Sequence, residues 1–556
     1  MPPITPLLAR DDENKSIANS SYLIIDDFSG IRTMLSGILR SAGVQPRAID
    51  FAADGREALS QLNAKRYDVV LCDHNLGTGQ NGMQVLEEAR YKQMIGPSCC
   101  WLMITADKTL ETVMGTAEAQ PDAYLLKPVT EVVLLSRIRR MKARKEAFND
   151  IDLAMMAHDY YRAISICEQR AATDKANAVD LLRLKCELLI HVGQTDQARG
   201  FYEKMLATRD QPWAQLGLAK IHLQLGEYDV TCELLEQLIT RSRNYLEAYD
   251  CLAQTYRRLK QGEKAEHILE RALALSPLSH ARQRAMGETA LTNNKHERAE
   301  KAFRMAIQLG EFSVHKSTDS YLGLAKALSA RGNSAEALNT LDKMVKVFDS
   351  EETKLLSKSV ECRILVDNGD LPRAQQQAEE IVQLLNRGNV GHLGPVATRD
   401  MAETLLMLGQ RDKAIELLRS EILNNPDDPA NIEAVRQIFQ KQGLCDEGNE
   451  MVEATRAQAV EMMNSSVLLS RSGDFSHAIA KMRQALEIMP RNVRLLLNAA
   501  HLLISHIEKT GADPALIREA RRHLLTANAC APGEPRFSDL MSRLETINAS
   551  TLAKAS

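Results

Sequence analysis

The chain has 556 residues, which is too long for one hydrophobic core, so we expect at least two domains. Its formal net charge is −4, and the missing basic excess argues against a nucleic-acid-binding protein. No run of about 18 apolar residues occurs, and the first ten residues lack the apolar core of a signal peptide. We therefore expect neither a membrane span nor a secretory leader.

The cysteine pattern and the aromatic content indicate the cellular compartment and the fold class. Ten cysteines are scattered along the chain without a CxxC pair or a Cys/His ligand group. Cysteines without such a pattern are most simply small, reduced core residues. Aromatic residues make up only 4% of the sequence, which is low for a sheet-rich protein. We expect a cytoplasmic, mostly helical protein.

The N-terminal part alternates short apolar runs with stretches of helical periodicity. Residues 1–20 are polar and contain prolines, so we expect a loose leader there. The runs predict strands at 21–26, 47–52, 68–73, 99–104 and 122–126. Helices are predicted at 29–42, 54–65, 82–94 and 107–118, and from about 130 to 145 or beyond. Strands separated by helices predict βαβ units, and the nearly continuous apolar runs predict a parallel sheet covered on both faces.

Polar side chains stand at the ends of four predicted strands. Asp26 and Asp27 close the first run, and Asp73 closes the third, just before a loop rich in Gly and Asn. Thr105 and Lys127 close the fourth and fifth runs. Because parallel strands place their carboxyl ends at one edge of a sheet, we expect these side chains to meet there. Three carboxylates, a hydroxyl and an ammonium can bind a divalent metal and carry a phosphoryl group.

After about residue 145 the strand signals stop, and a helical pattern repeats at a nearly constant interval. In many copies a Gly stands five residues before a small residue, which we call the small slot. The Gly permits a tight turn between two helices, and the small residue lets them approach closely. The slot can be traced through Ala163, Ala198, Thr231, Ala265, Ala299, Ala337, Ala374, Ala414, Gly448, Ala478 and Ala520. In several copies a Pro follows and ends the second helix.

This spacing resembles the tetratricopeptide repeat, whose period is about 34 residues. The segment 249–256 followed by Ala265, Leu269, Ala272 and Pro277 matches the repeat nearly column by column. The resemblance covers roughly residues 146–533, with degenerate copies at the start, near 448 and at the end. Wider spacings, such as the one from Ala299 to Ala337, indicate lengthened helices or turns. The resemblance implies an all-α superhelical solenoid of about eleven repeats, with a capping helix or tail at 534–556.

Residues 21–145 resemble the receiver domain of response regulators. The matching residues, in chain order and each near a strand end, are Asp26–Asp27, Asp73 with Asn75 and Gly82, Thr105–Ala106, and Tyr124 with Lys127–Pro128. The resemblance implies a doubly wound α/β domain with a five-stranded parallel sheet of the flavodoxin-like kind. It also implies a phosphoprotein of bacterial two-component signalling.

The resemblance assigns roles around a magnesium ion. Asp73 would be the nucleophile that takes a phosphoryl group from a histidine kinase or a phosphotransfer protein. Three clustered carboxylates repel one another, and Mg²⁺ is the hard, oxygen-seeking cation that suits them. Asp27 and Asp73 would be direct ligands, Asp26 a ligand largely through water, and the backbone carbonyl of Asn75 a further ligand. No organic cofactor is implied.

The remaining matched residues would respond to the phosphoryl group. Lys127 would pair with the carboxylate before transfer and with a phosphoryl oxygen afterwards, and the Thr105 hydroxyl would donate to a phosphoryl oxygen. In receivers this bond draws in the loop after strand four. The aromatic residue of strand five, which here is Tyr124, can then turn. Pro128 resembles the cis proline of the family. Phosphorylation would thus bias a two-state surface.

Simpler interpretations exist for each piece taken alone. An acidic pair is usually a solvated turn, a Lys–Pro pair is usually a loop, and a lone Tyr is usually a core residue. His74 is more simply a loop residue than a catalyst. A basic stretch on the helix leaving the receiver could contact nucleic acid, but such runs are usually solvated faces. Its members are Arg137, Arg139, Arg140, Lys142, Arg144 and Lys145.

Two functions remain open at this point. In the first, the chain is a response regulator in which phosphorylation of Asp73 gates the binding of a protein or peptide by the solenoid. In the second, it is a constitutive scaffold, or it docks a kinase and drains phosphoryl groups without gating. A transcription factor is a third interpretation, which the missing basic recognition helix counts against. Enzyme activity would be limited to self-phosphotransfer and autodephosphorylation, and a homodimer stays open.

Overall fold

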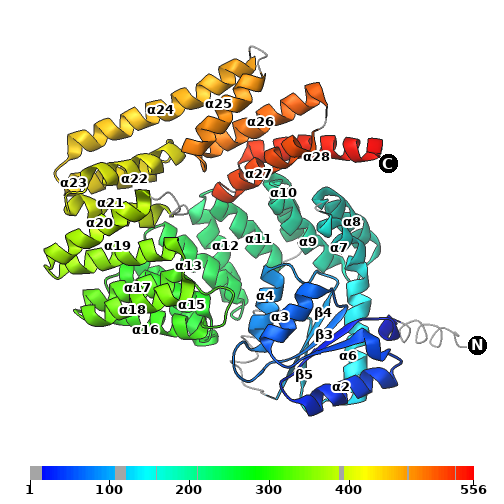
Figure 1. Cartoon of the computed structure of the whole chain (residues 1–556). Helices are drawn as coiled ribbons and strands as arrows, with labels where there is room; N and C mark the ends of the chain where they lie inside the picture. The colour runs from blue at the N-terminus through cyan, green and yellow to red at the C-terminus, as the bar shows by residue number, and fades with distance from the viewer. Residues whose placement is uncertain are drawn as a thin grey trace, which may run out of the picture. The chain divides into compact units, whose positions relative to one another are not determined.

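The computed structural model describes residues 16–106, 121–157, 159–208, 211–386, 394–471, 475–511, 513–531 and 534–555 (Figure 1). The described residues divide into two compact units. The first contains the chain up to Leu189 together with Arg199–Ser320, and the second contains Ile190–Ala198 and the chain from Tyr321 onward. The first unit therefore holds both the N-terminal sheet and several of the helical repeats.

A five-stranded parallel sheet forms the N-terminal part of the first unit. Its strands are β1 (Tyr22–Ile25), β2 (Ile49–Ala52), β3 (Val69–Asp73), β4 (Cys100–Thr105) and β5 (Ala123–Leu126). They lie in the order β2-β1-β3-β4-β5 with all neighbours parallel, which confirms the predicted doubly wound sheet. Every residue of β1, β3 and β4 is buried, and this explains their unbroken apolar runs.

Helices cover both faces of the sheet. α2 (Ser29–Ser41) and α6 (Glu131–Lys145) share one hydrophobic core with the sheet. α3 (Gly55–Ala64) and α4 (Gly82–Tyr91) share another core on the opposite face. Ile17, placed in the predicted loose leader, is instead buried in the first core, where its carbonyl accepts a hydrogen bond from the Tyr22 hydroxyl. The predicted helix 107–118 lies outside the described residues.

Beyond the sheet domain and the short 3-10 turn Glu146–Phe148, every regular element of the described chain is an α-helix. The helices are α7 (Asn149–Met156), α8 (Tyr160–Thr173), α9 (Ala178–His191), α10 (Thr195–Thr208), α11 (Pro212–Gln224), α12 (Tyr228–Arg241), α13 (Leu246–Arg258), α14 (Gly262–Leu275), α15 (His280–Thr292), α16 (His296–Leu309), α17 (Thr318–Ala330), α18 (Ser334–Phe348), α19 (Glu351–Asp367), α20 (Leu371–Asn386), α21 (Pro395–Met407), α22 (Arg411–Asn424), α23 (Pro429–Lys441), α24 (Cys445–Arg471), α25 (Phe475–Ile488), α26 (Val493–Thr510), α27 (Pro514–Cys530) and α28 (Pro535–Ala555). Consecutive helices such as α13 and α14, or α26 and α27, pack against each other as hairpins. None of the described helices is long and apolar enough to cross a membrane.

The small slot lies where the two helices of a hairpin meet. The alanines of the slot from Ala163 to Ala520, together with Thr231, are 0% exposed, and Gly448 is also buried. At Gly448 an added Cβ would lie 2.6 Å from the Phe439 side chain, so the helices touch there. This burial confirms why the slot holds small residues. The repeat spacing widens at Ala337 because the connection 310–317 between α16 and α17 is long.

Backbone conformation at the repeat turns gives a testable prediction. Gly226 has a φ of 77°, and an added Cβ would meet nothing within 4 Å. Lys260 occupies the same position of the next repeat with a φ of 58°. A residue with a Cβ is strained by about 1 kcal/mol in the left-handed conformation. Lys260→Gly should therefore stabilise the turn between α13 and α14, and Gly226→Lys should destabilise the turn between α11 and α12.

Amide hydrogen exchange in the flanking helices of the full chain measures both changes. Protection of α13 and α14 should rise in Lys260→Gly, and protection of α11 and α12 should fall in Gly226→Lys. Unchanged protection in Gly226→Lys would show that the turn does not depend on its left-handed backbone.

Candidate functional site

Three carboxylates meet at the carboxyl ends of β1 and β3. Asp26 and Asp27 follow β1 directly, and Asp73 is the last residue of β3. Carboxylate oxygens from all three lie within 4.8 Å of one another. Asp26 is 1% exposed and Asp73 is 7% exposed, whereas Asp27 is exposed. The sheet thus holds two of the carboxylates rigidly and leaves the third facing solvent.

The ammonium group of Lys127 lies inside this cluster. Lys127 follows β5, and its Nζ is 2.7 Å from Asp73 Oδ2 and 3.1 Å from Asp26 Oδ2. Its backbone N–H donates to the Thr105 carbonyl over 2.8 Å, which ties the end of β5 to the end of β4. The Lys127–Pro128 peptide bond is cis. The structure therefore brings the predicted lysine to the predicted carboxylates.

The charges of the site favour a divalent cation. Burial raises the pKa of Asp73, the Asp26 charge adds to this, and the ammonium of Lys127 opposes it. Burial lowers the pKa of Lys127, but its hydrogen bonds and ion pairs with Asp73 and Asp26 outweigh burial and leave that pKa raised. Three ionised carboxylates and one ammonium carry a formal charge of −2. Oxygen donors with this charge fit Mg²⁺.

The loop after Asp73 is held closed by its own backbone. The N–H of Gly82 donates to the His74 carbonyl over 2.9 Å, and the N–H of His74 donates to the Ile104 carbonyl over 2.8 Å. A Cβ at Gly82 would lie only 2.1 Å from the Asp73 carbonyl oxygen, so no larger residue fits there unless the backbone moves. The side-chain oxygen of Asn75 accepts from the Gly77 N–H over 3.1 Å and braces the loop.

Thr105 and Tyr124 occupy neighbouring strands beside the cluster. Thr105 ends β4 and is buried, next to Leu126 in the sheet register. Tyr124 is half-buried on β5 and packs against the core that contains Met103 and Trp101. The predicted site residues are thus gathered at one sheet edge and on the strand beside it. Their roles in phosphoryl transfer stay predictions.

Sequence patterns did not reveal how Asp26 is held. One oxygen of its carboxylate accepts from the Phe28 N–H over 2.9 Å, and its backbone carbonyl accepts from Arg32 Nη1 over 2.6 Å. Arg32 lies on α2, six residues after Asp26, and no motif marks it. The only signal in the sequence is a basic residue in the first turns of the helix that follows the acidic pair.

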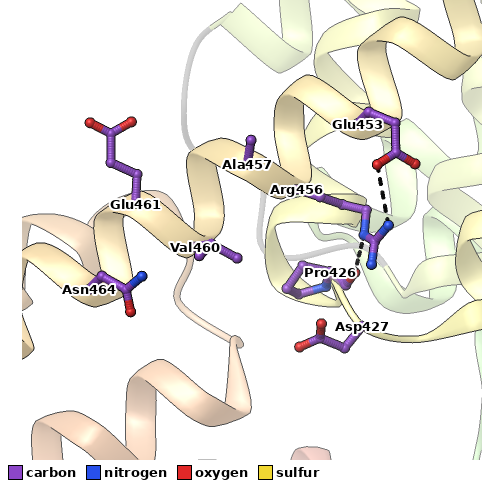
Figure 2. Close-up of a pocket in the computed structure, with 8 residues that line it drawn as sticks. All are labelled: Pro426, Asp427, Glu453, Arg456, Ala457, Val460, Glu461 and Asn464. Atoms are coloured by element: carbon purple, nitrogen blue, oxygen red, sulfur yellow. Dashed lines mark hydrogen bonds and ion pairs between the residues drawn. The ribbon is translucent and has the colours of Figure 1, made fainter.

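The repeats of the second unit contain an open pocket of about 770 Å³. Figure 2 shows it beside α24, with Pro426 and Asp427 contributed by the connection between α22 and α23. Arg456 Nε donates to the Pro426 carbonyl over 2.9 Å, and Arg456 also pairs with Glu453. The residues that line the pocket include no Ser, Cys or His. Its charged side chains are three carboxylates, from Asp427, Glu453 and Glu461, and the guanidinium of Arg456.

Comparisons with known proteins separate the chain into two parts. The family described as response regulator receiver domain matches residues 22–139. One family described as tetratricopeptide repeat matches residues 252–314. A second family with the same description matches residues 319–343 and 395–420. The chemotaxis protein CheY of Pseudomonas aeruginosa is 31% identical over 122 residues, which are 22% of this chain and 95% of that protein. Chemotaxis protein CheY-3 of Vibrio cholerae is 31% identical over 126 residues, which are 23% of this chain and 94% of that protein.

Two solved structures are similar to parts of the chain. The chemotaxis protein CheY4 of Vibrio cholerae has 29% identity and a TM-score of 0.20, and the match covers 22% of this chain and 98% of that one. A tetratricopeptide repeat protein of Parabacteroides merdae has 15% identity and a TM-score of 0.33, and the match covers 48% of this chain and 99% of that one. At these TM-scores the two structures add nothing to the assignment, which rests on the sequence matches.

Proposed function

This chain belongs to the response-regulator receiver family and carries tetratricopeptide repeats after its receiver, and from this premise we propose that phosphorylation of Asp73 gates protein binding by the repeats. The observation that carries the proposal is the position of Asp73, in contact with Lys127 and within 4.8 Å of two further carboxylates. The domains would be a receiver at 21–145, whose core also includes Ile17 of the predicted leader 1–20, then repeats at 146–533 and a capping helix or tail at 534–556.

Asp73 would act as the nucleophile. An Asp73 carboxylate oxygen forms a bond to phosphorus as the bond from phosphorus to the imidazole nitrogen of a phosphohistidine breaks. Asp27, Asp73 and the carbonyl of Asn75 would hold Mg²⁺ directly, with Asp26 holding it largely through water. Bound there, Mg²⁺ would neutralise charge on the phosphoryl oxygens.

The ammonium of Lys127 already touches the nucleophile. Its raised pKa keeps it charged, so it can move from the carboxylate to a phosphoryl oxygen without losing a proton. The Thr105 hydroxyl would donate to another phosphoryl oxygen, and Tyr124 would turn in response. Pro128 completes the set of switch residues. The chemistry of the chain would be limited to this self-phosphotransfer and to autodephosphorylation.

The partners follow from the two parts of the chain. A histidine kinase or phosphotransfer protein would supply the phosphoryl group, and a protein or peptide would bind the repeats. The basic stretch on α6 supports a structural linker over a nucleic-acid contact, because three of its six side chains bind groups of the same chain. Lys145 pairs with Asp122 over 2.8 Å, Arg144 pairs with Asp180, and Lys142 donates to the Ser16 carbonyl over 3.1 Å. We place the protein in the cytoplasm.

Gating makes a prediction about affinity. The full chain should bind its repeat ligand with a dissociation constant that changes about fivefold or more when Mg²⁺ and beryllofluoride, a phosphoryl mimic, are added, since allosteric couplings are typically of this size. Asp73→Ala should bind the ligand but show no change. If the parent accepts the phosphoryl group normally and its affinity stays constant, the chain is a passive scaffold or a phosphate sink.

A further inference from the structure

The receiver contacts one repeat connection within the first compact unit. Gln80 Nε2 donates to the Phe312 carbonyl over 3.0 Å, and Gln84 Nε2 donates to the Leu309 carbonyl over 3.3 Å. The rings of Tyr91 and His315 meet edge to face with centroids 5.5 Å apart. The receiver side of this contact is α4 and the loop before it. The repeat side is the end of α16 and the connection 310–317.

On the receiver side, the contact is attached to the loop that follows Asp73. Gln80 is in that loop. Asn81 is the N-cap of α4 and forms a capping box in which the Gln84 side-chain oxygen accepts from the Asn81 N–H. The side-chain oxygen of Gln84 therefore caps its own helix, and the side-chain nitrogen bonds to the repeats. A Cβ added at Gly55 would lie 2.8 Å from the Gln80 Cβ, so Gln80 packs closely against the start of α3.

On the repeat side, the contact satisfies a helix end. The Leu309 carbonyl belongs to the last turn of α16, where backbone carbonyls lack partners within the helix. The amino-terminal end of α4 thus meets the carboxyl-terminal end of α16, and their helix dipoles attract. The connection 310–317 is the lengthened one that widens the repeat spacing, whereas residues 276–279 suffice between α14 and α15. The added residues include Phe312 and His315, which make the contact.

We propose that Gln80, Gln84 and Tyr91 form a docking surface for the connection 310–317 of the same chain, and that phosphorylation of Asp73 releases this connection. The release rests on the proposed function, because it needs a phosphoryl group on Asp73. A phosphoryl group adds negative oxygens beside Asp73 and draws the N–H groups of the following loop toward them. Movement of that loop displaces Gln80 and the start of α4 from their carbonyl partners.

The surface differs from the one assigned to Thr105 and Tyr124. It uses α4 and the loop after Asp73, whereas Thr105 and Tyr124 lie on β4 and β5. Two neutral hydrogen bonds and one ring contact are weak enough for a single phosphoryl group to reverse. The connection would then leave the receiver while the hairpins on both sides of it stay folded.

Gln84→Glu tests the contact without disturbing the helix. The glutamate keeps the oxygen that completes the capping box and adds a charge that a helix amino terminus favours. It removes the amide donor and sets a carboxylate against the Leu309 carbonyl. Gln254→Glu, at an exposed position on α13, is the matched control.

Hydrogen exchange of the peptide spanning 309–317 in the full chain gives the readout. We expect exchange in Gln84→Glu to be about fivefold faster than in the parent, as loss of one hydrogen bond predicts, and Gln254→Glu to match the parent. Mg²⁺ with beryllofluoride should speed exchange in the parent to the same extent, and incorporation of phosphoryl label at Asp73 is measured in parallel.

Each failure has a separate signature. Parent-like exchange in Gln84→Glu overturns the docking contact whatever happens at Asp73. Normal labelling of Asp73 with unchanged exchange of 309–317 overturns the release and leaves the proposed phosphorylation standing. A parent that takes no label overturns the proposed function, and with it the release.

Discussion

Asp27→Asn should abolish the effect of Mg²⁺ on the receiver and slow phosphoryl transfer to Asp73 by about a hundredfold or more, because metal charge neutralisation is worth several kcal/mol in such reactions. Asp27 is the exposed member of the three-carboxylate cluster, so an amide can replace it without leaving a buried charge unpaired. Removing one carboxylate also reduces the repulsion within the cluster. The metal-free variant should therefore unfold no more easily than the parent.

The measurement compares thermal unfolding with and without Mg²⁺. A ligand present at a hundred times its dissociation constant stabilises the folded state by about 2.7 kcal/mol, and this gain should vanish in Asp27→Asn. Asp229→Asn, an exposed carboxylate on α12, is the matched control and should keep both the gain and the transfer rate. If Mg²⁺ still stabilises Asp27→Asn as much as it stabilises the parent, Asp27 is not a metal ligand.

Gly82→Ala should be among the most damaging single substitutions in the receiver. Its added Cβ would lie 2.1 Å from the Asp73 carbonyl oxygen and 2.8 Å from Cys72 Sγ. Both are buried in the sheet, so either the start of α4 or the end of β3 has to move. We expect a loss of about 1–3 kcal/mol or more in the free energy of unfolding, as for other overpacked cores. Phosphoryl transfer should fall as well, since the nucleophile lies on the displaced strand end.

Gly37→Ala is the matched control, for which we expect the free energy of unfolding to rise. Gly37 lies in the interior of α2, is exposed, and an added Cβ meets nothing within 4 Å. Alanine there should stabilise the receiver by about 0.5–1 kcal/mol. Urea unfolding followed by fluorescence of the buried Trp101, in a Trp213→Phe background, reports on the receiver alone. Equal stability of the two variants would contradict the close packing of Gly82.

Much of the receiver could be predicted from sequence because each signal had a direct physical cause. Strands buried on both faces must be apolar throughout, and their observed bounds lie within two residues of the predicted ones. Parallel strands put their ends at one edge, so Asp26, Asp73 and Lys127 meet although about a hundred residues separate the first from the last. The repeat helices were predictable because a buried small slot recurs at a nearly constant spacing.

The features that sequence did not predict depend on contacts or on local backbone strain. Lys260 and Asn294 adopt the left-handed conformation that glycine takes in other repeats, so a search for glycine misses these two turns. α24 runs for 27 residues, from Cys445 to Arg471, as one helix. Between Gly448 and Arg471 no Gly or Pro interrupts it, which explains the degenerate repeat pattern near 448. The bonds from Gln80 and Gln84 to the repeats join residues more than 200 positions apart, and no motif marks them.

Direct chemical mapping of the phosphoryl group on the full chain tests the central claim. The protein is incubated with Mg²⁺ and a small acyl phosphate donor or a phosphorylated kinase, and the peptide that contains Asp73 is analysed for an alkali-labile phosphoryl group. We predict one such group on Asp73 in the parent and none in Asp73→Asn. Equal label in Asp73→Asn, or no label in the parent from any donor, would contradict phosphorylation of this aspartate and the regulation built on it.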